Sequence, residues 1–586
     1  MSRLHQDTEQ TFITHDDVEI FYRYWPAISR ERRGAVVLFH RGHEHSARMA
    51  HLVDELDLPD FDFFAWDARG HGKSPGPRGF SPSFSSSVRD VQTFVSHIRE
   101  QYGIAEEDLA VIAQSVGAVL ITTWAHDYAP RIRCQVLASP AFKVKLYVPM
   151  ARPGLRLMQR LWGNFFVNSY VKAKFLTHDP ERQTSYDNDP LISRPISVNI
   201  LLELYRASER VVADAEAITI PTQLLISADD WVVHQGPQDE FFDRLGATIK
   251  EKHVLEGFYH DTLGELNRSQ ATDKVRRFIL ERFAQPLQRP DLNDADQQGH
   301  TFEETSALAR PLSSLSPRGM YWALARLNMK LGGMLSEGVR LGHATGFDSG
   351  CTLDYIYRNE ATGRGFLGRL IDRSYLNAIG WRGIRQRKLH IEELLQVAMN
   401  AVLGGGKELK IMDIAAGHGR YVLEALGQCS HRPASVLLRD YRDTNLQHGC
   451  KLISENGFQD VVRFELGDAF DQESLATVAP KPTIGIVSGL YELFPENDLV
   501  RRSLAGLAAA IEPGGYLVYT GQPWHPQLEF IARALSSHRG GAWVMRRRTQ
   551  AEIDQLVAQA GFEKIQQRID AWGIFTVSLA RRRATA

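Results

Sequence analysis

The stretch that most constrains the fold is residues 111–120, where an apolar run meets small residues on both sides of Ser115. Such a run predicts a buried strand that turns sharply into a helix, with the serine hydroxyl exposed on the turn. The G-x-S-x-G pattern of this turn has Ala113 in place of its first glycine and keeps Gly117. Taken alone, the pattern also fits a strand and a helix joined by a serine without a chemical role.

With 586 residues, the chain is long enough for two or three domains, each with its own core. Hydrophobic residues make up 43%, charged residues 24%, and the net charge is -2, so the composition indicates a globular protein that does not bind nucleic acid. The four cysteines are too widely spaced for a metal site, and we expect free thiols, no metal and a cytoplasmic location.

The N-terminus lacks an apolar h-region, and the sequence contains no run of about 18 apolar residues. We therefore expect neither secretion nor a membrane span. Peripheral contact with the inner membrane surface stays open.

Strands alternate with helices around this turn. Short β-like runs at residues 10–13 and 18–25 predict a hairpin, and apolar strands at 35–39 and 61–66 precede a helix at about 87–101. Alternation of this kind predicts a parallel sheet.

A serine nucleophile requires a carboxylate and a histidine that follow it in chain order. Asp229 and Asp230 follow one apolar strand, and His260 follows the next. His260 would take the proton of Ser115 and return it to the leaving group, while the carboxylate fixes the imidazole tautomer. Individually, these residues would also fit a turn aspartate and a surface histidine, but their order favours the catalytic interpretation.

The oxyanion that forms during such a reaction needs two backbone donors. One is the N–H of Val116, directly after the serine, and the other comes from the loop after strand 35–39, where Gly42 lets the backbone approach the substrate.

Residues 40–46, residues 67–74 and the Ser115 turn resemble monoacylglycerol lipase and lysophospholipase-type α/β-hydrolases. The resemblance covers about residues 10–285 and implies Asp230 as the acid, with Asp229 as the alternative. Arg41 stands where the family usually has glycine.

Residues 141–210 interrupt the alternation of strands and helices with many apolar side chains. We interpret them as a helical cap over the active site. The apolar side chains would either line a tunnel for an acyl chain or pack the cap onto the sheet. The first alternative favours a lipid or another lipophilic ester as substrate.

Residues 286–317 are polar and contain prolines without a hydrophobic period, which predicts a linker. Residues 318–400 then predict a helical extension, with a segment at 355–388 that is rich in arginine and aromatic residues. This segment, which includes Tyr357 and Arg387, would either form a cover that binds an anionic substrate or a membrane surface, or it would present solvated arginines on an ordinary helical extension.

A second chemical centre follows strand 409–412, where Asp413 begins a glycine loop that precedes a helix. The spacing D-x-x-x-G-x-G lets backbone approach a nucleotide-type ligand. Asp440 ends the next strand, where it can accept hydrogen bonds from ribose hydroxyls.

With a proline-glycine-glycine turn at 513–515 and a closing pair of strands, this region resembles class I S-adenosylmethionine-dependent methyltransferases over about residues 345–583. A nicotinamide dehydrogenase is the alternative with the same loop. The resemblance implies S-adenosyl-L-methionine as the cofactor, and its contacts would be Asp413, Ala415, Gly417, Gly419, Asp440, Asp468 and Ala469. Acceptor contacts would be Tyr491, Glu492, Trp524 and His525.

The predicted fold class is α/β throughout, with an α/β-hydrolase fold and helical cap followed by a Rossmann-like methyltransferase fold at residues 401–586. The arrangement resembles bacterial fusions of a lipase-like hydrolase with a methyltransferase. We expect a bifunctional enzyme that acts on small-molecule or lipid substrates. The rival is a lipid-binding or scaffolding protein with one or both centres inactive.

Overall fold

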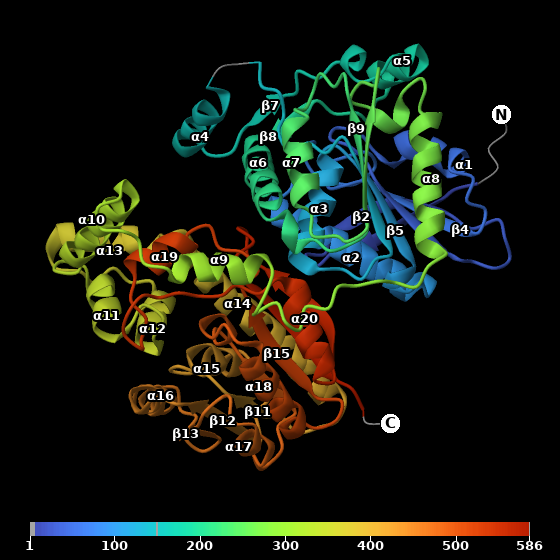
Figure 1. Cartoon of the computed structure of the whole chain (residues 1–586). Coiled ribbons are helices and arrows are strands. Elements are labelled where there is room, and N and C mark those ends of the chain that lie inside the picture. Colours follow the sequence, from blue (N-terminus) through green and yellow to red (C-terminus); the bar gives the residue numbers. More distant parts are fainter. Residues whose placement is uncertain (1–5, 148–149, 585–586) are drawn as a thin grey trace. The chain divides into compact units, whose positions relative to one another are not determined.

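The computed structural model describes residues 6–147 and 150–584 and divides into two compact units, Met1–Pro290 and Asp291–Ala586 (Figure 1). The described residues do not include residues 1–5, where a signal sequence would begin. They also do not include residues 148–149 of the expected cap. None of the described helices has both the length and the apolar sequence needed to cross a bilayer.

The first unit is built on an eight-stranded sheet with the order β1-β2-β4-β3-β5-β6-β9-β10. Strand β2 is antiparallel to both neighbours, and the other pairs are parallel. The strands are β1 (Thr8–Ile13), β2 (Glu19–Trp25), β3 (Gly34–Phe39), β4 (Phe61–Trp66), β5 (Leu109–Gln114), β6 (Cys134–Ala138), β9 (Thr222–Ser227) and β10 (Lys250–Leu255). This order confirms the predicted α/β-hydrolase fold.

Helices cover both faces of this sheet, which is why the central strands β3, β4 and β5 are buried at every position (Figure 1). Helices α1 and α8 pack on one face, and α2 and α3 pack together on the other. These elements are η1 (Ser46–Met49), α1 (His51–Glu55), α2 (Phe84–Tyr102), η2 (Glu106–Asp108), α3 (Val116–Tyr128), α7 (Gly236–Arg244), η5 (Thr262–Gly264) and α8 (Ser269–Phe283).

The segment expected to form a cap lies between β6 and β9. It contains α4 (Ala151–Trp162), β7 (Phe166–Asn168), η3 (Ala173–Phe175), α5 (Pro180–Asn188), β8 (Pro195–Ser197), α6 (Val198–Ala213) and η4 (Ala215–Ala217). β7 and β8 pair as a separate antiparallel ribbon, and α6 packs on α3. Every residue of α4 is at least partly exposed, so its apolar side chains do not serve to pack the segment onto the sheet.

The second unit has a seven-stranded sheet with the order β13-β12-β11-β14-β15-β17-β16. Strand β17 is antiparallel to β15 and β16, and the other pairs are parallel. The strands are β11 (Lys410–Asp413), β12 (Ser435–Asp440), β13 (Val462–Leu466), β14 (Ile484–Val487), β15 (Tyr516–Gly521), β16 (Phe562–Ile569) and β17 (Thr576–Arg582). The antiparallel closing pair confirms the predicted methyltransferase-like fold.

Successive residues of these strands point into two different cores. Ile411 and Val436 belong to the core beneath α14 and α15, whereas Met412 and Leu437 belong to the core beneath α18 and α20. This alternation requires helices on both faces. The helices that follow β11 are α15 (Arg420–Gly427), α16 (Asp443–Glu455), α17 (Gln472–Ala476), η6 (Tyr491–Leu493), α18 (Asn497–Ala510), α19 (Leu528–Ala534) and α20 (Gln550–Gln559).

The predicted helical extension consists of α10 (Pro317–Gly332), α11 (Glu337–Thr345), α12 (Gly350–Arg358), α13 (Gly365–Leu376) and α14 (Ile379–Gly404). Serine side chains accept backbone N–H hydrogen bonds at the starts of α10, α11 and α12, which separates them into short helices.

The stretch predicted as a linker, residues 286–317, is not a uniform connection in the structure. The two units divide at Pro290, and the stretch beyond it belongs to the second unit and contains α9 (His300–Ala309). Thr301 of this helix is buried and accepts a hydrogen bond from the buried Arg546. The sequence pattern did not indicate this packing because it rests on a polar contact and not on an apolar stripe.

Candidate functional site

Ser115 occupies a strained turn between β5 and α3. Its φ is 57° and its ψ is -116°, a backbone conformation that residues other than glycine rarely adopt. A Cβ at Gly117 would lie 2.4 Å from the carbonyl oxygen of His40, so this position excludes every side chain. The predicted turn is therefore present, and Ala113 is buried in β5 without disturbing it.

The structure brings Ser115, His260 and Asp230 together in one hydrogen-bonded chain. His260 Nε2 lies 2.7 Å from Ser115 Oγ, and His260 Nδ1 lies 2.7 Å from Asp230 Oδ2. All three side chains are buried, whereas the alternative Asp229 is exposed. The geometry therefore selects Asp230 over its neighbour.

Asp230 stays ionised despite its burial. Desolvation alone would raise the pKa of this carboxyl, but the charge of His260 and hydrogen bonds to the carboxylate hold the pKa below its usual value. The second oxygen accepts from the backbone N–H groups of Val232 at 2.6 Å and Val233 at 2.9 Å. Such a carboxylate can orient His260 and stabilise its protonated form.

The two predicted oxyanion donors are neighbours. A Cβ at Gly42 would approach Val116 Cγ2 to 3.2 Å, so the two backbone segments lie side by side. The loop is fixed by His40, whose Nδ1 donates to the Arg41 carbonyl at 2.7 Å while its Nε2 accepts from Ala68 N–H at 3.0 Å. This pattern requires a neutral imidazole, in agreement with burial lowering the pKa of His40.

Arg41, where the resembled family usually has glycine, is buried in a polar network. Its Nε and Nη2 donate to the two Glu44 carboxylate oxygens, each at 2.7 Å, and Nη2 lies 3.7 Å from Asp261. Asp261 directly follows His260, and its carboxylate also accepts from Gln114 at 3.1 Å. The arginine therefore links the oxyanion loop to the loop that carries the catalytic histidine.

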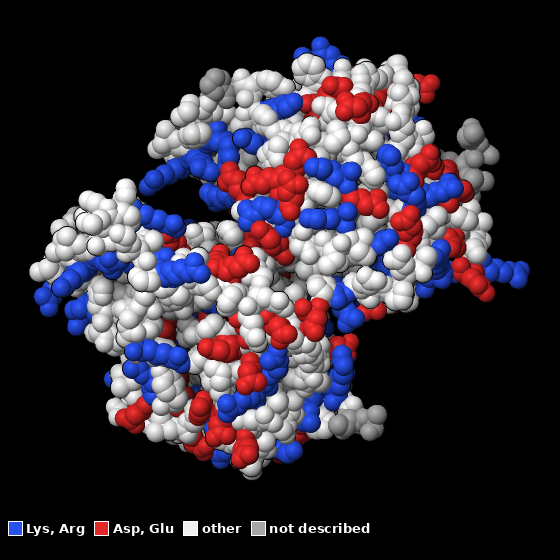
Figure 2. All heavy atoms as spheres, viewed as in Figure 1, with Lys and Arg blue, Asp and Glu red and all other residues white. Residues whose placement is uncertain are grey.

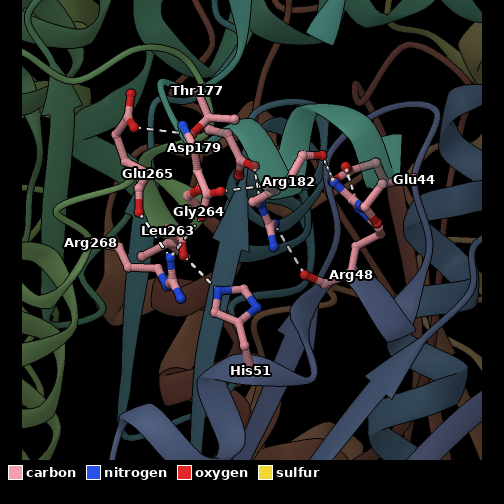
Figure 3. A network of polar contacts seen from close by, with 12 residues as sticks. Glu44, Arg48, His51, Thr177, Asp179, Arg182, Leu263, Gly264, Glu265 and Arg268 are labelled. Carbon is pink, nitrogen blue, oxygen red and sulfur yellow. Dashed lines mark hydrogen bonds and ion pairs between the residues drawn. The ribbon is translucent and has the colours of Figure 1, made fainter. Parts of the chain in front are cut away.

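The same network reaches the base of the cap through Arg182 of α5. Arg182 Nε donates to Asp261 at 2.5 Å, and its Nη2 donates to the Arg48 carbonyl at 3.1 Å. Figure 3 shows Arg182 lying between Arg48 and Arg268, and Thr177 donates to Glu265 at 3.0 Å. Three segments distant in sequence are thus held together by buried charge pairs beside the triad.

In the second unit, both glycines of the predicted cofactor loop have backbone conformations that other residues rarely adopt. Gly417 and Gly419 have φ values of 56° and 75°, and a Cβ at Gly419 would lie 2.5 Å from Leu438 Cδ1. Asp413 anchors the loop by accepting from Tyr421 Oη at 2.6 Å and from Ala415 N–H at 3.2 Å. Burial outweighs these hydrogen bonds and raises the pKa of Asp413 to about 7.

The remaining predicted cofactor residues surround this loop. Asp440 accepts from Gly417 N–H at 3.0 Å through one oxygen and from Arg442 N–H and Asn445 Nδ2 through the other. A carboxylate has about four acceptor sites, so one remains for a ribose hydroxyl. Asp468 is exposed at the end of β13, and Ala469 beside it is buried. The residues present fit S-adenosylmethionine.

Helices of the extension close this site, which the sequence did not predict. A small cavity is lined by the loop from Ala415 to Tyr421 together with Gly350, Asp354 and Arg387. A Cβ at Gly417 would lie 3.6 Å from the Gly350 Cα, so α12 leaves little room above the loop. The glycines at positions 346 and 350 were the available signal for this close approach.

His418 of the loop carries a charge. Burial would lower the pKa of its imidazole, but the Asp354 carboxylate, 3.8 Å from Nδ1, and Cys351, whose Sγ lies 3.6 Å from Nε2, raise the pKa to about 9. Ligand atoms of Cys351, His418 and His448 lie within 4.8 Å of one another, a spacing that could hold a metal. Because metal binding displaces protons from its ligands, a metal at this cluster would compete with the proton on His418.

A larger cavity of about 370 Å³ lies between the extension and the sheet of the second unit. Glu492 and His525, two of the predicted acceptor residues, line it. Tyr491 does not, because its side chain is buried in the core and donates to Ser503 at 3.0 Å. Trp524 instead lies against Arg547. Of the four predicted acceptor residues, Glu492 and His525 line this cavity, whereas Tyr491 and Trp524 do not.

Polar side chains that the sequence analysis did not assign to the acceptor site also line this cavity. Arg387 lines both cavities and pairs with Glu492 at 3.3 Å. Arg387 Nε, Gln522 Nε2 and Trp543 Nε1 are buried and lack protein partners among the described residues. The signal for Arg387 was its spacing from Ile384 and Ile391, which places it on the buried face of α14.

The imidazole of His525 is neutral in this cavity because burial lowers its pKa to about 4. Its Nδ1 accepts from Gln527 N–H at 3.0 Å, which places the ring proton on Nε2. His525 therefore presents a hydrogen-bond donor and not a base.

Comparison with known proteins agrees with this division into two units. A family model described as "Putative methyltransferase" matches residues 275–582, more than half of the 586-residue chain, and one described as "Serine aminopeptidase, S33" matches residues 30–267. The chain belongs to the first family and carries an α/β-hydrolase domain, so it is a fusion of a hydrolase with a methyltransferase-family domain.

The chain is 56% identical over 578 residues to the "Uncharacterized protein YnbC" of Escherichia coli, covering 98% of each chain. Its hydrolase unit is 25% identical to the monoacylglycerol lipase of Mycolicibacterium smegmatis, over 47% of this chain and 97% of that protein. A crystal structure of the Paleococcus ferrophilus monoacylglycerol lipase matches 47% of this chain and 99% of that one, with 23% identity and a TM-score of 0.40. The similarity to YnbC extends across both units.

Proposed function

We propose that the protein is a bifunctional enzyme, a serine ester hydrolase joined to an S-adenosylmethionine-dependent methyltransferase. The hydrolase half of the proposal rests on the chain of two 2.7 Å contacts through Ser115, His260 and Asp230. The methyltransferase half rests on the glycine loop and on the adjoining cavity, which share Arg387.

Hydrolysis proceeds by acyl transfer through Ser115. His260 Nε2 takes the hydroxyl proton as Ser115 Oγ bonds to the ester carbonyl carbon, and the N–H groups of Gly42 and Val116 hold the oxyanion. His260 then gives the proton to the leaving alcohol as the ester C–O bond breaks. Water, activated by the same histidine, releases the carboxylic acid and restores the serine.

The substrate class that we favour is a carboxylic ester of a lipid or lysolipid. Support comes from the similarity to monoacylglycerol lipases and from the exposed apolar residues of α4, among them Leu157, Leu161 and Trp162. Hydrolysis of short p-nitrophenyl esters without activity on any long-chain glyceride or lysophospholipid would remove the lipid from this proposal.

Covalent labelling tests the nucleophile. A fluorophosphonate probe should label the wild type, and Ser115→Ala should lose both the label and at least about 10³-fold of the esterase rate. Ser139→Ala, which removes a buried serine outside the triad, is the matched control and should keep the label. An unlabelled wild type would contradict the hydrolase.

For methyl transfer, the cofactor would be held by Asp413 and the glycine loop, by Asp440 at the ribose, and by Asp468 and Ala469 at the adenine. When bound, it supplies an electrophilic methyl group. Alignment of the acceptor contributes most of the catalysis in such a transfer. Glu492 accepts and His525 Nε2 donates hydrogen bonds that orient the acceptor in the larger cavity.

Calorimetry tests the cofactor site. Asp440→Asn should weaken binding of S-adenosylmethionine about tenfold or more, whereas the exposed Asp460→Asn should not. Glu492→Gln should keep cofactor binding and lose methyl transfer in cell extract supplied with methyl-labelled cofactor. If Glu492→Gln and His525→Gln both retained full transfer, the acceptor would lie elsewhere.

We infer that both reactions take place in the cytoplasm, or at the inner membrane surface, on small-molecule or lipid substrates and without nucleic acid. The net charge of -2 and the free cysteines support this inference. Absence of both the serine label and cofactor binding would favour a lipid-binding or scaffolding protein instead.

A further inference from the structure

Two helices of the second unit expose an unusual amount of apolar surface. In α10, Leu324, Leu327 and Leu331 recur at helical spacing and are each more than half exposed, and in α13 the exposed fraction of Phe366 is 80%. A Cβ at Gly332 of α10 would lie 4.0 Å from Ile371 Cγ2 of α13, so the two helices approach each other there, and we call their exposed apolar residues the α10–α13 face. Exposed apolar residues gathered on neighbouring helices favour an interaction site.

Helix α10 has its packing side elsewhere. Trp322 is buried and donates from its indole N–H to Glu529 at 3.1 Å, and α10 packs on α19. The outward leucines are therefore additional to the residues that hold the helix in place. Their exposure requires a function other than folding, because it opposes burial of apolar surface.

The exposed charged residues of these two helices are all basic. Arg326, Lys330, Arg369 and Arg373 are exposed on them, and Figure 2 shows blue Lys and Arg side chains beside uncharged residues in the region where Figure 1 labels α10 and α13. The acidic residue of α13, Asp372, is buried and accepts from Ser336 at 2.5 Å and from Tyr355 at 2.5 Å. An apolar surface fringed by Arg and Lys is complementary to an anionic lipid surface.

The α10–α13 face continues into the larger cavity. Met329 and Gly332 of α10, and Ile371 and Tyr375 of α13, contribute to the lining of the cavity of about 370 Å³. The same two helices thus have exposed apolar residues outside and form a wall of the cavity inside. A molecule held at this face would have a short path to the cavity.

The interior of the cavity complements the polar end of such a molecule. Arg387 Nε, Gln522 Nε2 and Trp543 Nε1 are buried donors without protein partners among the described residues, and His525 presents its Nε2 proton. Buried donors require acceptors, since a buried donor left unpaired destabilises the protein. An oxygen-bearing head group meets this need.

We propose that the α10–α13 face docks on an anionic bilayer and that the methyl acceptor is an amphipathic lipid, whose oxygen-bearing head group enters the cavity from that surface. The acceptor class rests on the proposed methyltransferase function, but the docking itself does not. Docking and cofactor binding can therefore be measured separately.

Flotation of the full chain with vesicles tests the docking. Vesicles of phosphatidylcholine with phosphatidylglycerol should carry the wild type upward, and phosphatidylcholine alone should carry less. Leu324→Glu with Leu327→Glu and Phe366→Glu should reduce binding at least about tenfold, because three exposed apolar contacts are replaced by repulsive charges. Leu389→Glu with Leu466→Glu and Ile565→Glu is the charge-matched control on other exposed sites of the second unit.

The result that overturns the proposal is flotation of the α10–α13 variant equal to that of the wild type. A loss shared by the control variant would assign binding to overall charge and would also overturn it. A wild type that does not float but forms dimers, which the α10–α13 variant does not form, would assign the face to a second copy. Calorimetry with S-adenosylmethionine on the same samples reports the cofactor site, so its failure is recognised independently.

Discussion

At the scale of single residues, His418 shows how the site sets the charge of one side chain. The imidazole lies in the glycine loop, with Asp354 3.8 Å from its Nδ1 and Cys351 Sγ 3.6 Å from its Nε2. These neighbours oppose the effect of burial and raise its pKa to about 9. A positive charge is therefore present beside the proposed cofactor at neutral pH.

This shift predicts a pH-dependent contribution to stability. A pKa raised from 6.5 to about 9 stabilises the folded state fully below about pH 6.5, and the contribution is lost as the pH rises through 9. The free energy of unfolding of wild type minus that of His418→Gln should fall by up to about 3 kcal/mol between pH 6 and 9.5. Urea unfolding of the full chain at several pH values measures this difference.

The exposed loop residue His431 provides the matched control. A pH dependence of equal size in His431→Gln would assign the effect to the loss of any histidine and not to the neighbours of His418. A difference for His418→Gln that is constant with pH would contradict the charge assigned to it.

Much of the hydrolase site was predictable at this scale because chain order and strand ends fix the approximate position of each residue. Ser115, Gly42, Val116 and His260 needed no knowledge of long-range contacts. The residues alone did not select Asp230 over Asp229, because two neighbours in sequence differ only in which side chain turns inward. In the second unit, Arg387 belonged to the predicted cover segment, but its pairing with Glu492 was not predictable because the two residues are distant in sequence.

At the scale of elements, Arg41 joins the oxyanion loop to the loop after β10, and Arg182 adds α5 of the cap. Removing one partner of a buried charge pair leaves a charge without compensation, which costs about 3–5 kcal/mol. We expect Arg41→Ala to destabilise the first unit by about 3 kcal/mol and to lower the esterase rate by loosening the oxyanion loop. Urea unfolding and initial rates check the two effects.

Arg276→Ala removes a surface pair with Asp57 and is the matched control, with an expected change below about 1 kcal/mol. Arg41→Lys should recover part of the stability but lose the two-pronged contact with Glu44. Equal stability of Arg41→Ala and the wild type would show that the network is not needed to hold these loops.

Strand identity and order were predictable because the apolar runs and the turns between them are local features. The helices of the extension were foreseen as helical sequence, but not their position over the glycine loop. That position depends on Gly350 approaching Gly417, a contact between segments that no periodicity connects.

At the scale of the whole molecule, the chain consists of two compact units that divide at Pro290. Each contains its own sheet, core and proposed site. We expect residues 1–290 to react with a fluorophosphonate and residues 291–586 to bind S-adenosylmethionine when produced separately. Loss of either property in a fragment that is folded by circular dichroism would contradict this independence.

The division itself was predictable from the change in composition after residue 285, but its extent was not. Thr301 and Arg546 make a polar contact that places part of the expected linker within the second unit. Polar contacts of this kind leave no hydrophobic period in the sequence.

Arg387 lines both of the described cavities of the second unit, so a movement of its side chain changes the lining of both. An acceptor that draws the guanidinium away from Glu492 alters the surroundings of the cofactor. Thermodynamic linkage then requires that each ligand change the affinity of the other by the same factor. The affinities of the two proposed ligands would thereby be coupled through the position of one side chain.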